Sequence, residues 1–215
     1  MHKILKLTIH EFIIQNKINN LSKFLFLFLL FCSLSLTLIN NQEDIKKFGA
    51  IFTIIYLPLS LIGFSSFVFR QDLDDGSLEV LLTTFSSSEI IITKFLGLVA
   101  SALIGTILNL PIIFLFFNLD RETIIAIPII LLILLPLTCS LLLLTGAVQS
   151  YFRSNTNFLS MLTMPMLIPN IIMSGISINE HGNLYLVPIM IGIDLIIIPC
   201  ALVLSAYLIK NIYNI

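Results

Sequence analysis

Six long apolar stretches follow one another along the chain and are separated by short polar segments. They cover residues 21–39, 48–69, 95–117, 123–148, 158–178 and 184–209. Each is close to the roughly 20 apolar residues that a helix needs to cross a membrane. Strands of a membrane barrel would alternate apolar and polar positions, whereas these stretches are apolar on every face. The pattern predicts an all-α, polytopic membrane protein with six transmembrane helices in one domain, residues 1–215.

The segment before the first apolar stretch has a different pattern. Its apolar side chains Leu5, Ile9 and Ile13 share one face of a helix, whereas Lys6 and Lys17 lie elsewhere. A helix with two such faces lies in the interface of a membrane. We therefore expect residues 1–20 to form an amphipathic interfacial helix along the inner membrane surface. A disordered basic tail is the alternative.

Composition supports the membrane class and excludes several functions. The chain is 58% hydrophobic and 11% charged, whereas soluble domains have about 25% charged residues. A net charge of −1 excludes a strongly basic nucleic-acid binder. The three cysteines lie inside apolar stretches without metal-ligand spacing, and no phosphate-binding G-x-x-x-x-G-K-[ST] motif is present. We expect a non-catalytic chain that binds no cofactor or metal directly.

The basic residues predict how the chain is oriented. With the amino terminus inside, the outer loops contain Lys46, Lys47 and Arg121, and the other eight lysines and arginines lie on the inner side. Inner loops of membrane proteins carry the excess of these residues. Both termini are therefore expected on the cytoplasmic or matrix side of a bacterial or mitochondrial inner membrane. The polar segment between the second and third stretches then also lies inside.

That inner segment contains the sequence RQDLDDGSLEVLL, Arg70–Leu82, with five charges between two apolar stretches. Gly76 permits a turn, and Asp75 is expected to cap a helix that starts at Ser77. Four apolar residues then recur with helical spacing: Leu78, Leu81, Leu82 and Phe85. The pattern predicts a short amphipathic coupling helix within a cytoplasmic segment covering residues 70–90.

The charge of this segment indicates what it binds. A helix that lies on the inner leaflet would carry lysine and arginine, because that leaflet is anionic. This segment instead carries Asp72, Asp75 and Glu79. We therefore expect the apolar face to occupy a groove of a partner protein, with the acidic residues paired to a basic rim. A solvated loop is the alternative.

The third apolar stretch has small or polar residues at every fourth position. They are Gly97, Ser101, Gly105 and Asn109. Small residues with this spacing let two helix backbones approach closely. We expect a packing face, within one subunit or between two; a substrate path is the alternative.

One carboxylic acid, Asp194, lies in the body of the sixth apolar stretch. A carboxylate in a membrane is costly unless it is protonated, paired or directed into a polar cavity. Asp194 is therefore an intramembrane polar candidate for transport. A neutral, hydrogen-bonded acid is the alternative.

The acidic segment resembles a known motif. DDGSLEVLLTTFSSSEIIITKFLG is similar to the E-x-G-[ST]-L-E-x-L-L segment of ABC-2 type transporter permeases. FRQDLDDGSLEVLL resembles more narrowly the F-R-x-D-L-x-D-G-[ST]-L-E-x-L stretch of the CcmB family, haem exporter protein B of cytochrome c maturation. The matching residues are Phe69, Arg70, Asp72, Leu73, Asp75, Gly76, Ser77, Leu78, Glu79 and Leu81. The family often has prolines after this helix, where this chain has Phe85 followed by three serines.

The resemblance implies a permease subunit that couples a separate CcmA-like ATPase to the membrane. CcmC- and CcmD-like subunits and a CcmE-like haem chaperone would be its other partners, and ATP would be hydrolysed on the ATPase subunit. The implied activity is haem export, or ATP-dependent release of the haem-loaded chaperone. Two ATPase subunits imply two permease copies. The implied ATPase-coupling residues are Arg70, Asp72, Asp75, Gly76, Ser77, Leu78, Glu79, Leu81, Leu82 and Phe85.

Two other functions fit the same pattern of apolar stretches. One is an ABC-2 permease that exports another substrate, such as a lipid, a polysaccharide or a drug. The other is a membrane assembly scaffold without transport. Loss of c-type cytochromes on deletion, without loss of another export, would favour the cytochrome c maturation permease over the exporter of another substrate. If the chain were only a scaffold, mutants that abolish ATP hydrolysis by the partner should leave cytochrome assembly intact.

Overall fold

The computed structural model describes residues 2–36, 42–64, 67–152, 164–179 and 183–212. Every regular element in these ranges is an α-helix, as expected from the apolar pattern. The helices are α1 (His2–Lys17), α2 (Leu21–Leu36), α3 (Gln42–Ile62), α4 (Phe67–Asp74), α5 (Ser77–Thr84), α6 (Ser87–Phe117), α7 (Arg121–Tyr151), α9 (Met164–Asn179) and α10 (Val187–Asn211). The all-α fold class is thus confirmed.

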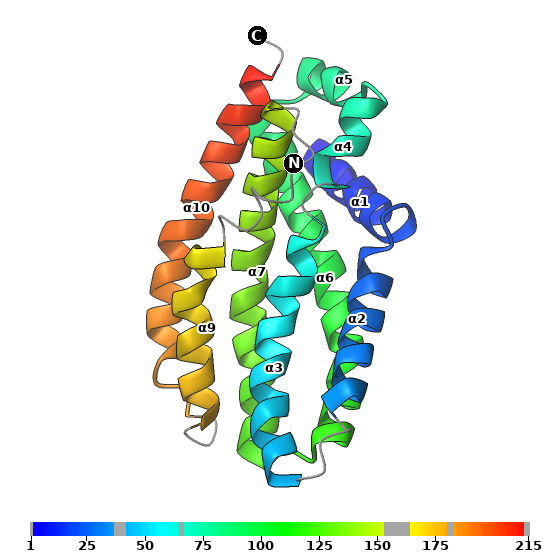
Figure 1. Ribbon diagram of the computed structural model, residues 1–215. Helices are drawn as coiled ribbons and strands as arrows, with labels where there is room; N and C mark the ends of the chain where they lie inside the picture. Colours follow the sequence, from blue (N-terminus) through cyan, green and yellow to red (C-terminus); the bar gives the residue numbers. More distant parts are fainter. Residues whose placement is uncertain (1, 37–41, 65–66, 153–163, 180–182, 213–215) are drawn as a thin grey trace.

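Three helices of the described chain are long and apolar enough to cross a membrane: α6, α7 and α10. The pair α1 and α2, which is bent by 45°, would add a fourth span if it is counted as one. The apolar parts of α3 (Phe48–Leu61) and α9 are shorter. Figure 1 shows α2, α3, α6, α7, α9 and α10 running along one common axis. The prediction of six spans remains a prediction.

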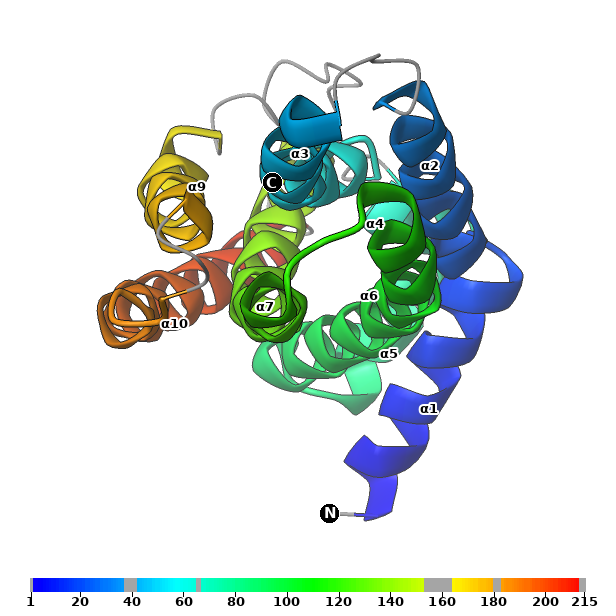
Figure 2. The ribbon, with the colours of Figure 1, turned by 90° about the horizontal axis from the view of Figure 1, so that it is seen from below.

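The core of the bundle lies along α7. Two thirds of its most apolar window (67%) is buried, against 17% for α10. Leucines such as Leu134, Leu137 and Leu143 are fully buried on this helix. Helix α10 packs along α7, and α1 and α2 pack along α6. Seen along the bundle, α1 runs outward past α6 (Figure 2). The acidic segment between the second and third apolar stretches joins this bundle through α4, which packs on α7, and α5, which packs on α6.

The polar segment is more helical than expected. The second apolar stretch does not continue unbroken to Phe69, because α3 ends at Ile62 and α4 begins at Phe67. The next long helix, α6, begins at Ser87, eight residues before the predicted span. With 31 residues and a rise of 1.5 Å per residue, α6 is about 46 Å long. That exceeds the hydrocarbon core of about 30 Å, so α6 also reaches the polar segment.

The early start of α6 has a local cause. Ser86 is its N-cap: the Ser86 hydroxyl accepts a hydrogen bond from the Glu89 N–H, and the Glu89 carboxylate accepts one from the Ser86 N–H at 2.9 Å. This reciprocal capping box satisfies two donors that a helix start otherwise leaves unpaired. The serines that stand where the CcmB family often has prolines therefore start a long helix.

Candidate coupling site

The acidic segment folds into two short helices at one end of the bundle. Helix α4 carries Arg70 and Asp72, and α5 begins at Ser77 (Figure 1). Between them Gly76 has φ +68° and ψ 6°, the left-handed conformation that favours glycine. The expectation that Asp75 caps α5 is wrong, because the N-cap is Gly76 and no side chain caps the helix. The turn therefore depends on the backbone freedom of Gly76.

The predicted apolar face of α5 is partly covered by the chain itself. Leu78 is fully buried in the main core, and Leu82 is half-buried against it. Leu81 and Phe85 are half-buried too. Val80, in contrast, is 65% exposed. Leu78 therefore fastens α5 to the bundle and is not available to a partner.

The outer surface of the segment is polar and mostly acidic. Glu79 and Thr83 are exposed beside Val80 on α5. Asp74 and Asp75, at the end of α4, are exposed as well. Arg70 forms an exposed pair with Asp74, with Nε 3.7 Å from Oδ2. A hollow of about 340 Å³ lies beside them, lined by Asn19, Arg70, Gln71, Asp74 and Asp75. The surface at this end of the bundle can thus pair with basic side chains of a partner.

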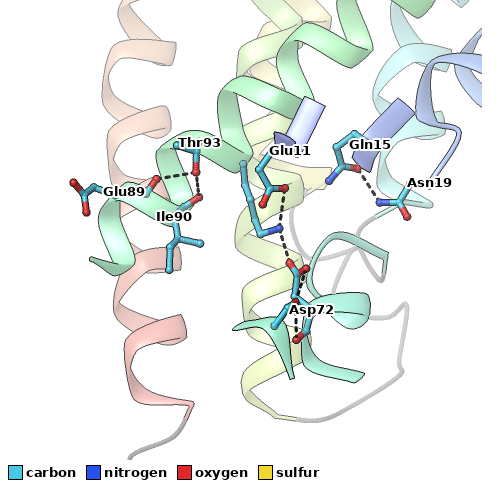
Figure 3. A network of polar contacts seen from close by, with 9 residues as sticks. Glu11, Gln15, Asn19, Asp72, Glu89, Ile90 and Thr93 are labelled. Carbon is cyan, nitrogen blue, oxygen red and sulfur yellow. Dashed lines mark hydrogen bonds and ion pairs between the residues drawn. The ribbon is translucent and has the colours of Figure 1, made fainter. Parts of the chain in front are cut away.

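Behind this surface, three helices meet at one buried lysine. Lys94 of α6 is 1% exposed, and its Nζ lies 3.0 Å from Oε2 of Glu11 in α1. The same Nζ lies 2.5 Å from Oδ2 of Asp72 in α4. Figure 3 shows Glu11 and Asp72 pointing toward each other from the two helices. The two distances place Lys94 Nζ between their carboxylates. The three side chains connect the amino-terminal helix, the acidic segment and α6.

Further contacts hold this buried group in place. Ser77, the first residue of α5, donates a hydrogen bond to Oδ1 of Asp72 at 3.2 Å. The Phe69 ring is also fully buried, with its centroid 5.5 Å from Lys94 Nζ. An ammonium group over an aromatic face gains electrostatic energy when it is desolvated. The lysine therefore has two carboxylates and a ring as neighbours, and α5 is joined to the group through Ser77.

Burying these charged groups costs free energy, so the group requires close partners. Two or three charges taken out of water cost several kcal/mol each, which only close and well-oriented partners offset. If one partner is removed, the others remain as uncompensated buried charges, and the loss is about 3–5 kcal/mol. The group is therefore stable only while α1, α4 and α6 keep their relative positions. A shift of any one of these helices relative to the other two would separate the paired charges.

The four predicted packing residues of α6 face α1 and α2 of the same chain. A Cβ on Gly97 would lie 3.1 Å from the Glu11 Cβ, and one on Gly105 would lie 2.9 Å from the Leu25 Cβ. Ser101 accepts a hydrogen bond from Asn16 at 3.1 Å. Asn109 bonds to the Gly105 carbonyl, 3.0 Å away. Among the described residues, this face of α6 contacts α1 and α2 of the same chain.

Asp194 lies far from the acidic segment, between α9 and α10. Its side chain is 7% exposed, and its Oδ1 accepts a hydrogen bond of 2.6 Å from Asn170 Nδ2. Asn170 is fully buried, and its own Oδ1 has no hydrogen-bond partner among the described residues. The pair joins two helices within their apolar parts. A role in transport remains a prediction.

Glu11 and Lys94 belong to the site, although the pattern of apolar stretches does not indicate it. A signal for each was present: Glu11 is the only acid in the first helix, and Lys94 directly precedes a long apolar stretch. No local pattern connects the two residues, because they are 83 positions apart. Nothing in the spacing shows that α1 turns back along α6.

The described residues contain no candidate metal centre. No group of three or more histidine, cysteine, aspartate or glutamate side chains in these ranges could hold a metal ion. The buried charges at Lys94 form contacts within the chain instead of a reaction site. The arrangement can therefore transmit a displacement from α4 and α5 to α6 and α1.

Comparisons with known proteins identify the family. A family model described as "CcmB protein" matches residues 3–211. An uncharacterized protein of Rickettsia conorii is 48% identical over 215 residues, the full length of both chains. An uncharacterized protein of Rickettsia prowazekii is 46% identical over the same length, again the whole of both chains. No solved structure matches.

Proposed function

The chain belongs to the CcmB family, and from this premise we propose that it is the permease subunit of an ABC transporter for cytochrome c maturation. In this proposal a separate CcmA-like ATPase binds at the α5 end of the bundle. ATP-driven closure of two ATPase subunits moves two permease copies, in a complex with CcmC- and CcmD-like subunits. The result is haem export or release of a haem-loaded, CcmE-like chaperone.

The observation that carries the proposal is the ion-pair group at Lys94. A coupling segment must be connected rigidly to the helices that it moves. Here Asp72 of the acidic segment is paired with Lys94 of α6, and Lys94 is also paired with Glu11 of α1. A push on α4 or α5 therefore displaces α6, the first long membrane helix after the segment. A solvated loop would have no such buried connection.

The burial of side chains in the acidic segment supports a narrower proposal for the ATPase contact. Leu78 and Asp72 face the interior, so we assign them to fastening the segment to the bundle. The contact itself falls to Val80, Glu79 and Thr83, which are exposed on the outer face of α5. The exposed acids at the end of α4 add negative charge beside them. Charge complementarity of this kind mainly raises association rate and specificity.

Co-purification tests the docking surface. The chain and its candidate ATPase are expressed together in membranes, solubilised in mild detergent and purified through a tag on the chain. Val80→Asp should abolish recovery of the ATPase without changing the elution profile of the chain, because the side chain is 65% exposed. Arg121→Asp, at the exposed start of α7 on the opposite end of the bundle, is the matched control. Unchanged ATPase recovery with Val80→Asp would reject this surface.

Leu78 serves as a second variant with a different expected result. Because Leu78 is fully buried, Leu78→Asp should lower the amount of folded chain as well as ATPase recovery. The cargo is tested separately, by measuring c-type cytochromes in a strain whose own gene is deleted and replaced by each variant. Normal cytochrome levels in the deletion strain would overturn the proposed function, whatever the docking result.

A further inference from the structure

Helix α1 exposes a surface that the bundle leaves uncovered. Leu5, Ile9 and Ile13 follow one another at intervals of four residues and are 58%, 52% and 42% exposed. Lys3, Lys6 and Lys17 are exposed on the adjoining side of the helix. At 100° per residue the two rows lie next to each other around the helix. The uncovered side of α1 is therefore half apolar and half basic.

The remaining side of α1 faces α6 and contains its only acid. Glu11 is 2% exposed and is paired with Lys94. Gln15, one turn further on the same side, is 1% exposed. The negative charge of the helix is thus neutralised inside the protein. Among the described residues, no carboxylate lies within ion-pair distance of the three exposed lysines.

We propose that this surface of α1 binds anionic phospholipid headgroups, with Leu5, Ile9 and Ile13 inserted among the acyl chains and Lys3, Lys6 and Lys17 at the phosphates. Charge and shape favour lipid over a protein partner here. A flat row of aliphatic side chains beside lysines is typical of a helix in a membrane interface. Each lysine near an anionic surface strengthens attachment several-fold, so three together supply roughly 100-fold.

The sequence does not show that Glu11 is buried, and this burial matters for binding to an anionic surface. In a free helix the carboxylate would weaken the attraction to an anionic surface. Paired with Lys94, it instead fastens the lipid-binding helix to α6 and, through Asp72, to α4. Headgroups bound at α1 then hold the whole connected body at the membrane. Lipid binding itself does not depend on the proposed ATPase partner.

The absence of tryptophan from the chain permits a direct test. Ile9→Trp places a single fluorescent reporter on α1, and the full-length chain is reconstituted in vesicles that contain brominated phosphatidylglycerol or brominated phosphatidylcholine over the same series of mole fractions. Brominated lipids quench tryptophan on contact. Leu195→Trp, on α10 at a position 70% exposed, reports ordinary lipid contact within the span.

We expect brominated phosphatidylglycerol to quench the α1 reporter at several-fold lower mole fraction than brominated phosphatidylcholine, and both lipids to quench the α10 reporter equally. Replacing Lys3, Lys6 and Lys17 with Gln should remove the preference, whereas Lys210→Gln, an exposed lysine on α10, should keep it. Raising the salt concentration should weaken the preference for phosphatidylglycerol too.

Equal quenching of the α1 reporter by both lipids would overturn the proposal. Protection of this reporter from both lipids would also overturn it and would assign the surface to a protein partner.

Discussion

Lys94 Nζ lies 2.5 Å from Oδ2 of Asp72, so an ammonium group near the start of α6 neutralises a carboxylate of the acidic segment. The contact joins two helices that the sequence separates by a turn, a short helix and a second turn. Both side chains are withdrawn from solvent, with exposures of 1% and 12%. Together with Glu11 they form the connection on which the proposed coupling depends.

Removing this lysine should destabilise the protein strongly. Lys94→Met leaves the buried carboxylates of Glu11 and Asp72 without a counter-charge, so we expect a loss of about 3–5 kcal/mol. Unfolding of the purified chain in detergent, followed by its elution profile after heating, measures the effect. The triple variant Glu11→Gln/Asp72→Asn/Lys94→Met should recover part of the loss because no charge remains buried.

The exposed pair Arg70–Asp74 provides the comparison for this first prediction. Its Nε–Oδ2 distance is 3.7 Å and both side chains are more than half exposed. Exposed pairs contribute about 0–1 kcal/mol, so Arg70→Ala should leave the unfolding temperature nearly unchanged. If Arg70→Ala and Lys94→Met had equal effects, the central role given to Lys94 would be wrong.

The second prediction concerns how closely α2 approaches α6 at Gly105. A Cβ added there would lie 2.9 Å from the Leu25 Cβ and 3.0 Å from the Ser22 carbonyl oxygen, which is backbone and cannot rotate away. Gly105→Ala should therefore cost about 1–3 kcal/mol, as overpacking does. Gly192→Ala on α10 meets nothing within 4 Å and is the matched control. It should be neutral or slightly stabilising in the same assay, because alanine favours a helix.

Much of this fold could be predicted from periodicity and composition. The helical class, the short helix from Ser77 and the position of the Gly76 turn follow from local rules of spacing and backbone freedom. The capping box at Ser86 and Glu89 is a local signal as well, because a serine followed three residues later by a glutamate is typical of a helix start. It explains why α6 begins at Ser87 and not at the first residue of the apolar run.

The orientation of α5 and the group at Lys94 could not be predicted in this way. The spacing of Leu78, Leu81 and Leu82 shows that they share a face, but not whether that face is covered by this chain or by a partner. That depends on α4 folding back so that Leu78 reaches the core. The pairing of Glu11 with Lys94 likewise depends on α1 lying along α6, a contact between distant parts of the chain.

The third prediction follows from the conformation of Gly76. Its φ of +68° is unfavourable for any residue with a Cβ, while a Cβ there would meet nothing within 4 Å. The cost of Gly76→Ala is therefore a backbone cost of about 1–2 kcal/mol. Gly76→Asn should cost less, because asparagine adopts this conformation more readily. If both variants recovered as much ATPase as the original chain, the left-handed conformation at position 76 would not be required for the contact.

The fourth prediction separates a structural from a transport role of Asp194. Asp194→Asn keeps an oxygen that accepts the 2.6 Å hydrogen bond from Asn170, so stability should be preserved. Asp194→Leu leaves the buried Asn170 amide without this partner, which should cost about 1–3 kcal/mol. Asn170→Leu/Asp194→Leu should restore part of that loss, because both partners are then apolar. Thermal unfolding in detergent measures all three variants.

Cytochrome levels in cells then decide between the two roles of Asp194. If the side chain only holds α9 and α10 together through its hydrogen bond, Asp194→Asn should support normal levels of c-type cytochromes, because that hydrogen bond is kept. If the carboxyl group itself takes part in transport, the same variant should be as stable as the original chain and yet fail to support them. A stable but inactive Asp194→Asn variant would therefore contradict the purely structural role and identify the α9–α10 pair as part of the transport path.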